Sequence, residues 1–215
     1  MDGSTAKSLD IANPSESNLT STVLDQDLRI LLLTAANPGA GTTTSAMAMA
    51  GQLAQMSSGK VLLVDASQSA GNLSQQLGLT KERGLHDLLF NTQNPPLLQD
   101  CVVDVSSLPF HVLPAGRFPR SNEHLTPERL SHLLDDLGSR YRFVVIDGDA
   151  VYSAADTLVI STQVDGVIMV VRCEDTRWEV AQAAAQRLTQ AGATLVGSVF
   201  NRRKYYMPKW LYKNL

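Results

Sequence analysis

The 215-residue sequence has few of the features of secreted, membrane-spanning or nucleic-acid-binding proteins. It contains only two cysteines, Cys101 and Cys173, which lie far apart in the sequence. We therefore expect no disulfide framework, and we expect a cytoplasmic location. No apolar run approaches the about 20 residues of a membrane span, and MDGSTAKSLD does not resemble a signal peptide. The four histidines lack metal-ligand spacing. Lys and Arg number 18 against 21 Asp and Glu, a net charge of −3 that disfavours nucleic acid as a partner.

Composition divides the chain into three regions. Residues 1–27 are rich in Ser, Thr, Asn and Asp, and we interpret them as a flexible N-terminal tail or a loosely docked arm. Residues 28–201 carry the apolar periodicity of a globular domain. Residues 202–215 form a basic, aromatic C-terminal tail.

The domain contains short apolar runs that alternate with helical patterns. The runs, none of which alternates with polar residues, are Leu28–Thr34, Val61–Asp65, Phe143–Asp147, Val167–Val171 and Leu195–Phe200. The expected helices are Thr43–Met56, a helix from Pro127 to Gly138 with Thr126 as its N-cap, and Thr176–Gln190. Strands of this kind have both faces covered. The sequence therefore predicts an α/β fold with a mostly parallel central sheet and helices on both faces.

A glycine-rich segment, TAANPGAGTTT at Thr34–Thr44, joins the first strand to the first long helix. Glycines there let backbone N–H groups approach a phosphate at a helix N-terminus. In the P-loop pattern GxxxxGK[ST], Gly41 and Thr43 match, but Thr42 stands at the lysine position. The candidate nucleotide-binding residues are Pro38, Gly39, Ala40, Gly41, Thr42, Thr43 and Thr44. A tight turn that binds no ligand is the alternative.

Two acidic residues end predicted strands. Asp65 and Asp147 should emerge at the carboxyl edge of the sheet, where open α/β folds bind ligands. One such aspartate can hold Mg²⁺ in P-loop proteins. We therefore take Asp65 and Asp147 as candidate catalytic residues, and Thr43, Asp65 and Asp147 as candidate magnesium ligands. A helix cap or turn is the alternative for each aspartate.

Several motifs in fixed order resemble one family. Beside the loop, which resembles TSxxPGEGKST, they are VLLVDASQSAG (compare VLLIDADLRxP), GLHDLL, LPAGRFPRSNEHL, YRFVVIDGDA (compare YDxVIIDTPP), DGVIMVVR and LVGSVFN. From about Leu28 to Asn201 the chain resembles the bacterial tyrosine autokinases of capsular and exopolysaccharide systems, which belong to the MinD/ParA-like P-loop ATPases. The resemblance implies a site for ATP or ADP with Mg²⁺.

Two departures from these motifs change the expected chemistry. Thr42 stands where the family has the P-loop lysine, and Ser67 stands where it has a second aspartate. Loss of one preorganised charged group typically costs on the order of 10²–10³ in rate. We expect phosphoryl transfer to be absent or very weak, while nucleotide binding stays open. A lysine from elsewhere, such as Lys60 or one from a neighbouring subunit, is the alternative.

The resemblance implies a regulatory protein of exopolysaccharide biosynthesis or export. It would dock on the cytoplasmic ends of a membrane polysaccharide co-polymerase or export protein, at the inner face of the cell membrane. Formation of a homodimer is a further possibility. Residues 202–215 could contact that partner or the bilayer, and Tyr205, Tyr206 and Tyr212 are candidate phosphoacceptors. The alternatives are an active or residual ATPase or tyrosine autokinase of the same pathway, and a MinD/ParA-like positioning ATPase.

Overall fold

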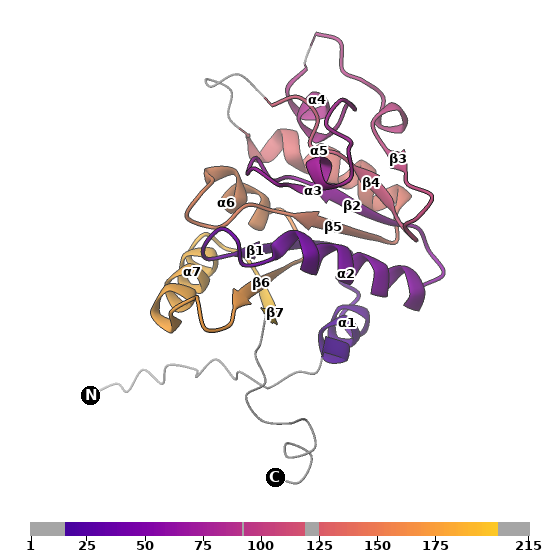
Figure 1. Ribbon diagram of the computed structural model, residues 1–215. Helices are drawn as coiled ribbons and strands as arrows, with labels where there is room; N and C mark the ends of the chain where they lie inside the picture. The colour runs from indigo at the N-terminus through magenta and orange to yellow at the C-terminus, as the bar shows by residue number, and fades with distance from the viewer. Residues whose placement is uncertain (1–15, 92, 119–124, 202–215) are drawn as a thin grey trace, which may run out of the picture.

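The structure is a computed structural model that describes residues 16–91, 93–118 and 125–201 (Figure 1). In the first half of the chain its elements are α1 (Glu16–Asp25), β1 (Ile30–Ala35), α2 (Thr42–Met56), β2 (Val61–Asp65), α3 (Leu73–Gln76), α4 (Leu85–Phe90), η1 (Leu98–Asp100) and β3 (Val103–Asp104). They are followed by β4 (His111–Leu113), α5 (Pro127–Arg140), β5 (Phe143–Asp147), α6 (Ala155–Ser161), β6 (Gly166–Arg172), α7 (Trp178–Gln190) and β7 (Leu195–Asn201).

The strands form one sheet in the order β3-β4-β2-β5-β1-β6-β7. Every neighbouring pair is parallel except β3 with β4. This confirms the predicted α/β fold with a mostly parallel sheet. Because β1 lies between β5 and β6, Leu33 pairs with Asp147 on one side and with Ile168 on the other. The loop after β1 therefore leaves the sheet between the ends of β5 and β6.

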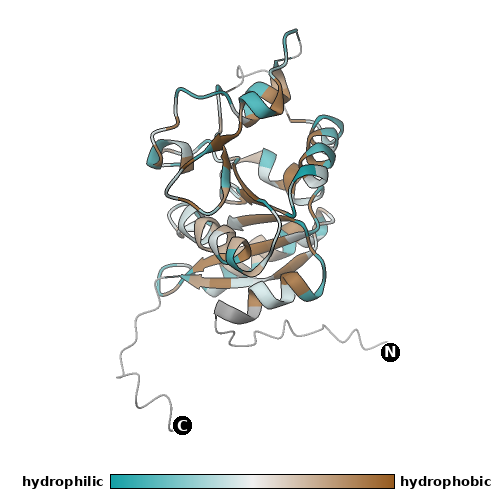
Figure 2. Cartoon of the chain, turned by 90° about the vertical axis from the view of Figure 1, so that its right-hand side faces the viewer, coloured by the Kyte–Doolittle hydropathy of each residue, from teal (hydrophilic) through white to brown (hydrophobic). Residues whose placement is uncertain are grey.

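Helices cover both faces of this sheet (Figure 1). α4, α5, α6 and α7 pack on one face against side chains such as Leu32 and Ile146. α1, α2 and α3 pack on the other, against side chains such as Leu31 and Val145. Successive residues of a strand point to opposite faces, so a sheet covered twice needs uninterrupted apolar strands. Figure 2 shows these apolar strands at the centre of the molecule.

Most predicted elements lie where the apolar patterns place them. β2 and β5 have the predicted bounds, and β1, β6 and β7 differ by one or two residues. α5 begins at Pro127 after Thr126, as predicted, but continues past Gly138 to Arg140. Within the described residues, no helix has both the length and the apolarity that a membrane crossing needs.

Of the two interpretations of residues 1–27, α1 contradicts the flexible tail and agrees with a docked arm. Leu19 and Val23 lie one turn apart on this helix and are buried. Thr20 is buried too, and its hydroxyl donates a 2.7 Å hydrogen bond to Oε1 of Gln52 in α2. The helix is held by tertiary packing, which its mostly polar sequence does not reveal.

The prediction that every strand is covered on both faces is wrong for β7. This strand is half-buried along most of its length, and Phe200 is 41% exposed. The reason is its position, because β7 forms the edge of the sheet beside β6.

Candidate functional site

The glycine-rich loop joins β1 to α2 and is open to solvent on its outer side. Gly39 and Gly41 have φ values of +78° and +94°, a conformation that favours glycine. Gly41 is the N-cap of α2, and no side chain of the described residues caps the helix there. The first N–H groups of a helix have no partner within it, so this end of α2 is suited to an anion.

The seven predicted loop residues differ in exposure. Pro38, Gly39 and Thr44 are exposed, Gly41 to Thr43 are half-buried, and Ala40 is buried. Among them, Thr43 lies close enough to Asp147 for its hydroxyl to affect the pKa of that carboxyl.

Asp147 ends β5 next to the loop and lacks the partners that buried acids usually have. The residue is 1% exposed, and neither of its carboxylate oxygens has a hydrogen-bond partner within the described part of the chain. Its pKa is raised to about 7, mainly by burial and in smaller part by the charges of Asp65 and Asp149, while the Thr43 hydroxyl lowers it. A buried, unpaired carboxylate costs free energy that a bound cation would offset. Asp147 and Thr43 therefore fit a magnesium ion.

Asp65 ends β2, beside Asp147 in the sheet, and its oxygens already accept hydrogen bonds. Oδ2 accepts from the backbone N–H and the hydroxyl of Ser74, at 2.7 and 2.6 Å, and Oδ1 accepts from the N–H of Ser67 at 3.2 Å. Burial raises the pKa of Asp65, while these donors lower it. Asp65 thus anchors α3 to the sheet, and its role as a magnesium ligand stays a prediction.

A third carboxylate, Asp149, was not among the sequence-predicted residues. Its Oδ1 accepts from the hydroxyls of Ser67 (2.6 Å) and Ser69 (2.5 Å), and its Oδ2 accepts from the N–H of Gln68 (2.8 Å). Asp149 therefore holds the loop after β2 onto the loop after β5. Ser67, which replaces the second family aspartate, serves here as a hydrogen-bond donor to this carboxylate.

The opposite side of the loop is formed by the ends of β6 and β7. The Asn201 amide donates a 2.9 Å hydrogen bond to the carbonyl oxygen of Ala40, and a Cβ at Gly41 would collide with the same amide. One guanidinium nitrogen of Arg172 lies 3.9 Å from the position of a Cβ on Gly39. Sequence reasoning missed Arg172 and Asn201, although both follow apolar runs in the same way as Asp65 and Asp147.

Lys60, a predicted source of the missing cation, does not reach the described site. Lys60 immediately precedes β2, so it lies at the amino edge of the sheet, opposite the loop, and cannot replace the P-loop lysine within one chain. Tyr205, Tyr206 and Tyr212 lie outside the described residues. In the part of the chain that the structure describes, no group of three or more His, Cys, Asp or Glu side chains is placed to hold a metal ion alone. A bound magnesium ion would thus take some of its ligands from the phosphate oxygens of a nucleotide.

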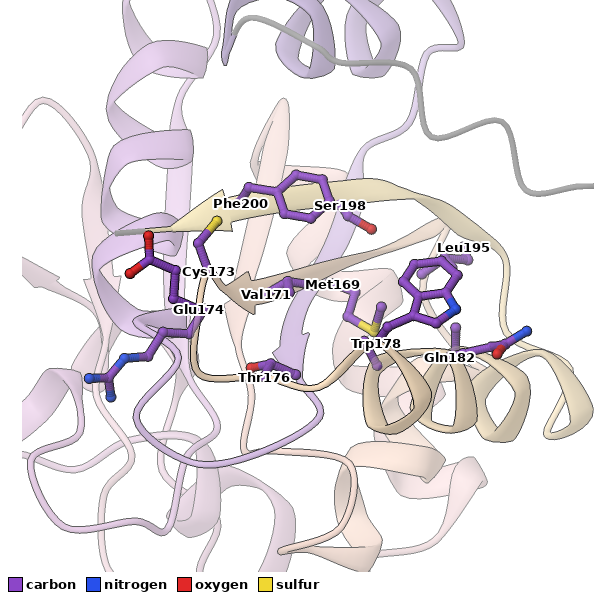
Figure 3. A pocket seen from close by; sticks show the side chains of 13 residues that line it. Met169, Val171, Cys173, Glu174, Thr176, Trp178, Gln182, Leu195, Ser198 and Phe200 are labelled. Carbon is purple, nitrogen blue, oxygen red and sulfur yellow. The ribbon is translucent and has the colours of Figure 1, made fainter. Parts of the chain in front are cut away.

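A mainly apolar groove lies near the ends of β6 and β7, between these two strands and α7 (Figure 3). Its cavity volume is about 290 Å³. Trp178 of α7 and Phe200 of β7 line it, 53% and 41% exposed. Arg172 also lines the groove, so its side chain separates the groove from the glycine-rich loop.

Comparison with known proteins places this site in a family. The pattern of the AAA domain family matches residues 28–194, most of the chain. The chain belongs to the AAA domain family. The match covers the loop, both strand-end aspartates and Arg172.

Tyrosine kinases are among the relatives of this AAA domain. EpsB of Ralstonia nicotianae, whose name assigns it provisionally to the tyrosine-protein kinases, is 31% identical over 179 residues, which are 82% of this chain and 23% of EpsB. The chain thus spans about a quarter of the length of this curated relative. The crystal structure of the VpsO kinase domain has a TM-score of 0.73 and 29% identity, covering 87% of this chain and 96% of that domain.

A similar fold occurs in the septum site-determining protein MinD. MinD of Pyrococcus horikoshii, solved with Mg-ADP, has a TM-score of 0.65 at 23% identity and covers 86% of this chain and 76% of its own. These findings confirm the resemblance to bacterial tyrosine kinases and, in fold, to the MinD/ParA-like P-loop ATPases.

Proposed function

We propose that this AAA domain binds a magnesium nucleotide but does not transfer its phosphoryl group, and that it regulates exopolysaccharide biosynthesis or export through protein contacts. The observation that carries the proposal is the buried, unpaired carboxylate of Asp147 beside Thr43, at the start of a helix whose loop has threonine at the lysine position.

Nucleotide binding is supported by the parts of the site that match the P-loop. Gly39 and Gly41 have positive φ values, and no side chain within the described residues caps the N-terminus of α2. Thr43 and Asp147 would hold the magnesium ion, which supplies charge neutralisation for the phosphate groups when it is bound. The remaining contacts would come from backbone N–H groups of the loop.

Loss of phosphoryl transfer is supported by the two positions at which this chain lacks the charged residues of the family motifs. Thr42 is neutral and short, so it cannot stabilise charge on the transferred group. Ser67 donates to Asp149 rather than presenting a carboxylate of its own, and both oxygens of Asp65 are already engaged. Each such loss costs on the order of 10²–10³ in rate.

The pathway and the partner are supported by the family resemblance and by the kinase relatives. The partner would be a membrane polysaccharide co-polymerase or export protein, contacted at its cytoplasmic ends, and the chain would lie at the inner face of the cell membrane. Residues 202–215, with five Lys or Arg and no acid, suit an anionic partner or the lipid surface beside it.

The biochemical part is tested by titrating the full chain calorimetrically with Mg·ADP, and by measuring phosphate release and phosphotyrosine. We expect binding with no turnover. The triple variant Thr42→Lys, Ser67→Asp, Asp149→Pro introduces the family residues at these three positions, and removing Asp149 avoids two carboxylates at hydrogen-bond distance. This variant should gain activity. Turnover by the wild type at the rate of the triple variant would favour the autokinase alternative, and absence of binding would refute the proposal.

The physiological part is tested in the source organism by deleting the gene and measuring the amount and chain length of its exopolysaccharide. The wild-type gene and the Thr42→Lys variant should both restore the amount and chain length of the polysaccharide, because the proposed regulation does not need turnover. A defect in cell division or plasmid partition with normal polysaccharide would favour the MinD/ParA-like alternative.

A further inference from the structure

Arg172 ends β6 at the level where the glycine-rich loop leaves β1. Ala35, the last residue of β1, pairs with Val170, two residues before Arg172. From there the Arg172 side chain reaches the loop, with one guanidinium nitrogen 3.9 Å from the position of a Cβ on Gly39. Since Gly39 has no side chain, the backbone is open to an anion at that point.

The backbone around Arg172 is fixed by hydrogen bonds to its neighbours. The N–H of Thr176 donates to the Arg172 carbonyl oxygen at 3.0 Å, and the N–H of Cys173 donates to the carbonyl oxygen of Asn201 at 3.0 Å. The arginine and the asparagine on the two strand ends beside the loop are thus held together.

Among the described residues, the Arg172 guanidinium forms only a loose ion pair. Its ion pair with Asp175 measures 3.5 Å, and the two side chains are 34% and 64% exposed. Exposed pairs of this kind contribute about 0–1 kcal/mol. A phosphate group, which accepts two parallel hydrogen bonds from a guanidinium, would compete well for Arg172.

The charges around the loop are distributed unequally. Thr34–Thr44 contains no charged residue. On the β5 side, Asp65, Asp147 and Asp149 are all buried, and an anion in the loop would be repelled by them. Arg172 lies on the β6 side, where it can offset that repulsion.

We propose that Arg172 supplies the positive charge that the loop lacks at Thr42, so that the phosphate site is completed from strand β6. The ligand class is a nucleoside di- or triphosphate with magnesium, and the inference rests on the proposed nucleotide binding. The guanidinium leaves Asp175 and contacts phosphate oxygens above Gly39. The charge needed for binding is thereby restored, while the second acid position remains serine.

The test is calorimetric titration of the full chain with Mg·ADP. Arg172→Gln should weaken binding about 10- to 100-fold, the range expected for hydrogen bonds to a charged group. Arg172→Lys should keep most of the affinity. Arg177→Gln, which removes an exposed arginine five residues away, is the matched control and should change the Kd less than about 2-fold. Thermal unfolding of each variant checks that it is folded.

Repeating the Arg172→Gln substitution in the Thr42→Lys variant tests whether the Arg172 charge replaces the missing lysine. In Thr42→Lys the loop has its own cation, so adding Arg172→Gln should cost less than about 3-fold, a non-additivity typical of groups that serve one function. An equal loss in both backgrounds would overturn the inference, because Arg172 would then act independently of the lysine position.

The remaining outcomes separate this inference from the proposed function. If the wild type binds Mg·ADP and Arg172→Gln behaves like Arg177→Gln, the inference is wrong and nucleotide binding stands. If only Thr42→Lys binds, the cradle is intact, but both the binding of nucleotide by the wild type and the replacement of the lysine by Arg172 are wrong. If neither binds, the proposed nucleotide site itself is wrong.

Discussion

At the scale of single residues, the buried carboxyl of Asp147 makes the stability of the fold depend on pH. Its pKa is raised to about 7 in the folded chain, mainly by burial, against an ordinary value of 3.8. At Asp147 the folded state therefore binds more protons than the unfolded state between about pH 4 and pH 7. The contribution of Asp147 to stability is present below pH 4, falls as the pH rises to 7, and is constant above it.

Replacing Asp147 with asparagine removes this buried charge while keeping the shape of the side chain. Asp147→Asn should raise the free energy of unfolding at pH 8 by roughly 2–4 kcal/mol and change it little at pH 4.5. Urea unfolding at the two pH values measures the difference. Asp104→Asn, at an exposed position, is the control. A gain of the same size at both pH values would show that ionisation of Asp147 is not the cause.

Sequence patterns located only one side of the site. Asp65 and Asp147 could be identified because each directly ends an apolar run. Arg172 and Asn201 end apolar runs in the same way, but their relevance depends on β6 lying beside β1 and β7 beside β6. The order of strands in a parallel sheet is set by crossover connections and not by the residues of each strand. The basic side of the loop therefore needed the structure.

At the scale of secondary-structure elements, α1 is the clearest difference from the sequence prediction. Its ten residues, ESNLTSTVLD, are mostly polar, and such a short segment is a marginal helix alone. The burial of Leu19 and Val23 stabilises it, and a Cβ on Gly197 of β7 would come within 2.8 Å of Leu19. The partners of α1 are thus distant in sequence. The strands β2 and β5 could be predicted because their burial needs an apolar run that is visible locally.

The packing of α1 can be tested by shortening one of its buried side chains. Val23 is fully buried among residues of α2 and the sheet. Val23→Ala should lower the free energy of unfolding by about 1–3 kcal/mol, because it removes buried methyl groups and leaves a cavity. Asp25→Ala, on the same helix but exposed, should change it by less than about 0.5 kcal/mol. Equal effects of the two substitutions in urea unfolding would mean that α1 does not stay docked in solution.

At the scale of the whole molecule, the two faces of the sheet are covered very differently. Four helices, α4 to α7, pack on one face, whereas α2 with the shorter α1 and α3 covers the other. Removing α1 would therefore expose part of a face that has few other helices. The domain boundary at residue 28, predicted from composition, separates this helix from the core that it covers.

Two truncated chains compare that boundary with the one in the structure. Residues 16–201 retain every described element, and we expect their Tm to lie within about 2 °C of the full chain. Residues 28–201 lack Leu19, Thr20 and Val23, all buried. Loss of roughly 3–5 kcal/mol of side-chain burial should lower the Tm by about 6–20 °C, since 1 kcal/mol shifts the Tm of a domain of this size by about 2–4 °C. Calorimetric unfolding of the three chains measures both differences. Equal Tm values for the two truncated chains would contradict a core that includes α1, because the face that α1 covers in the structure would then be stable without it.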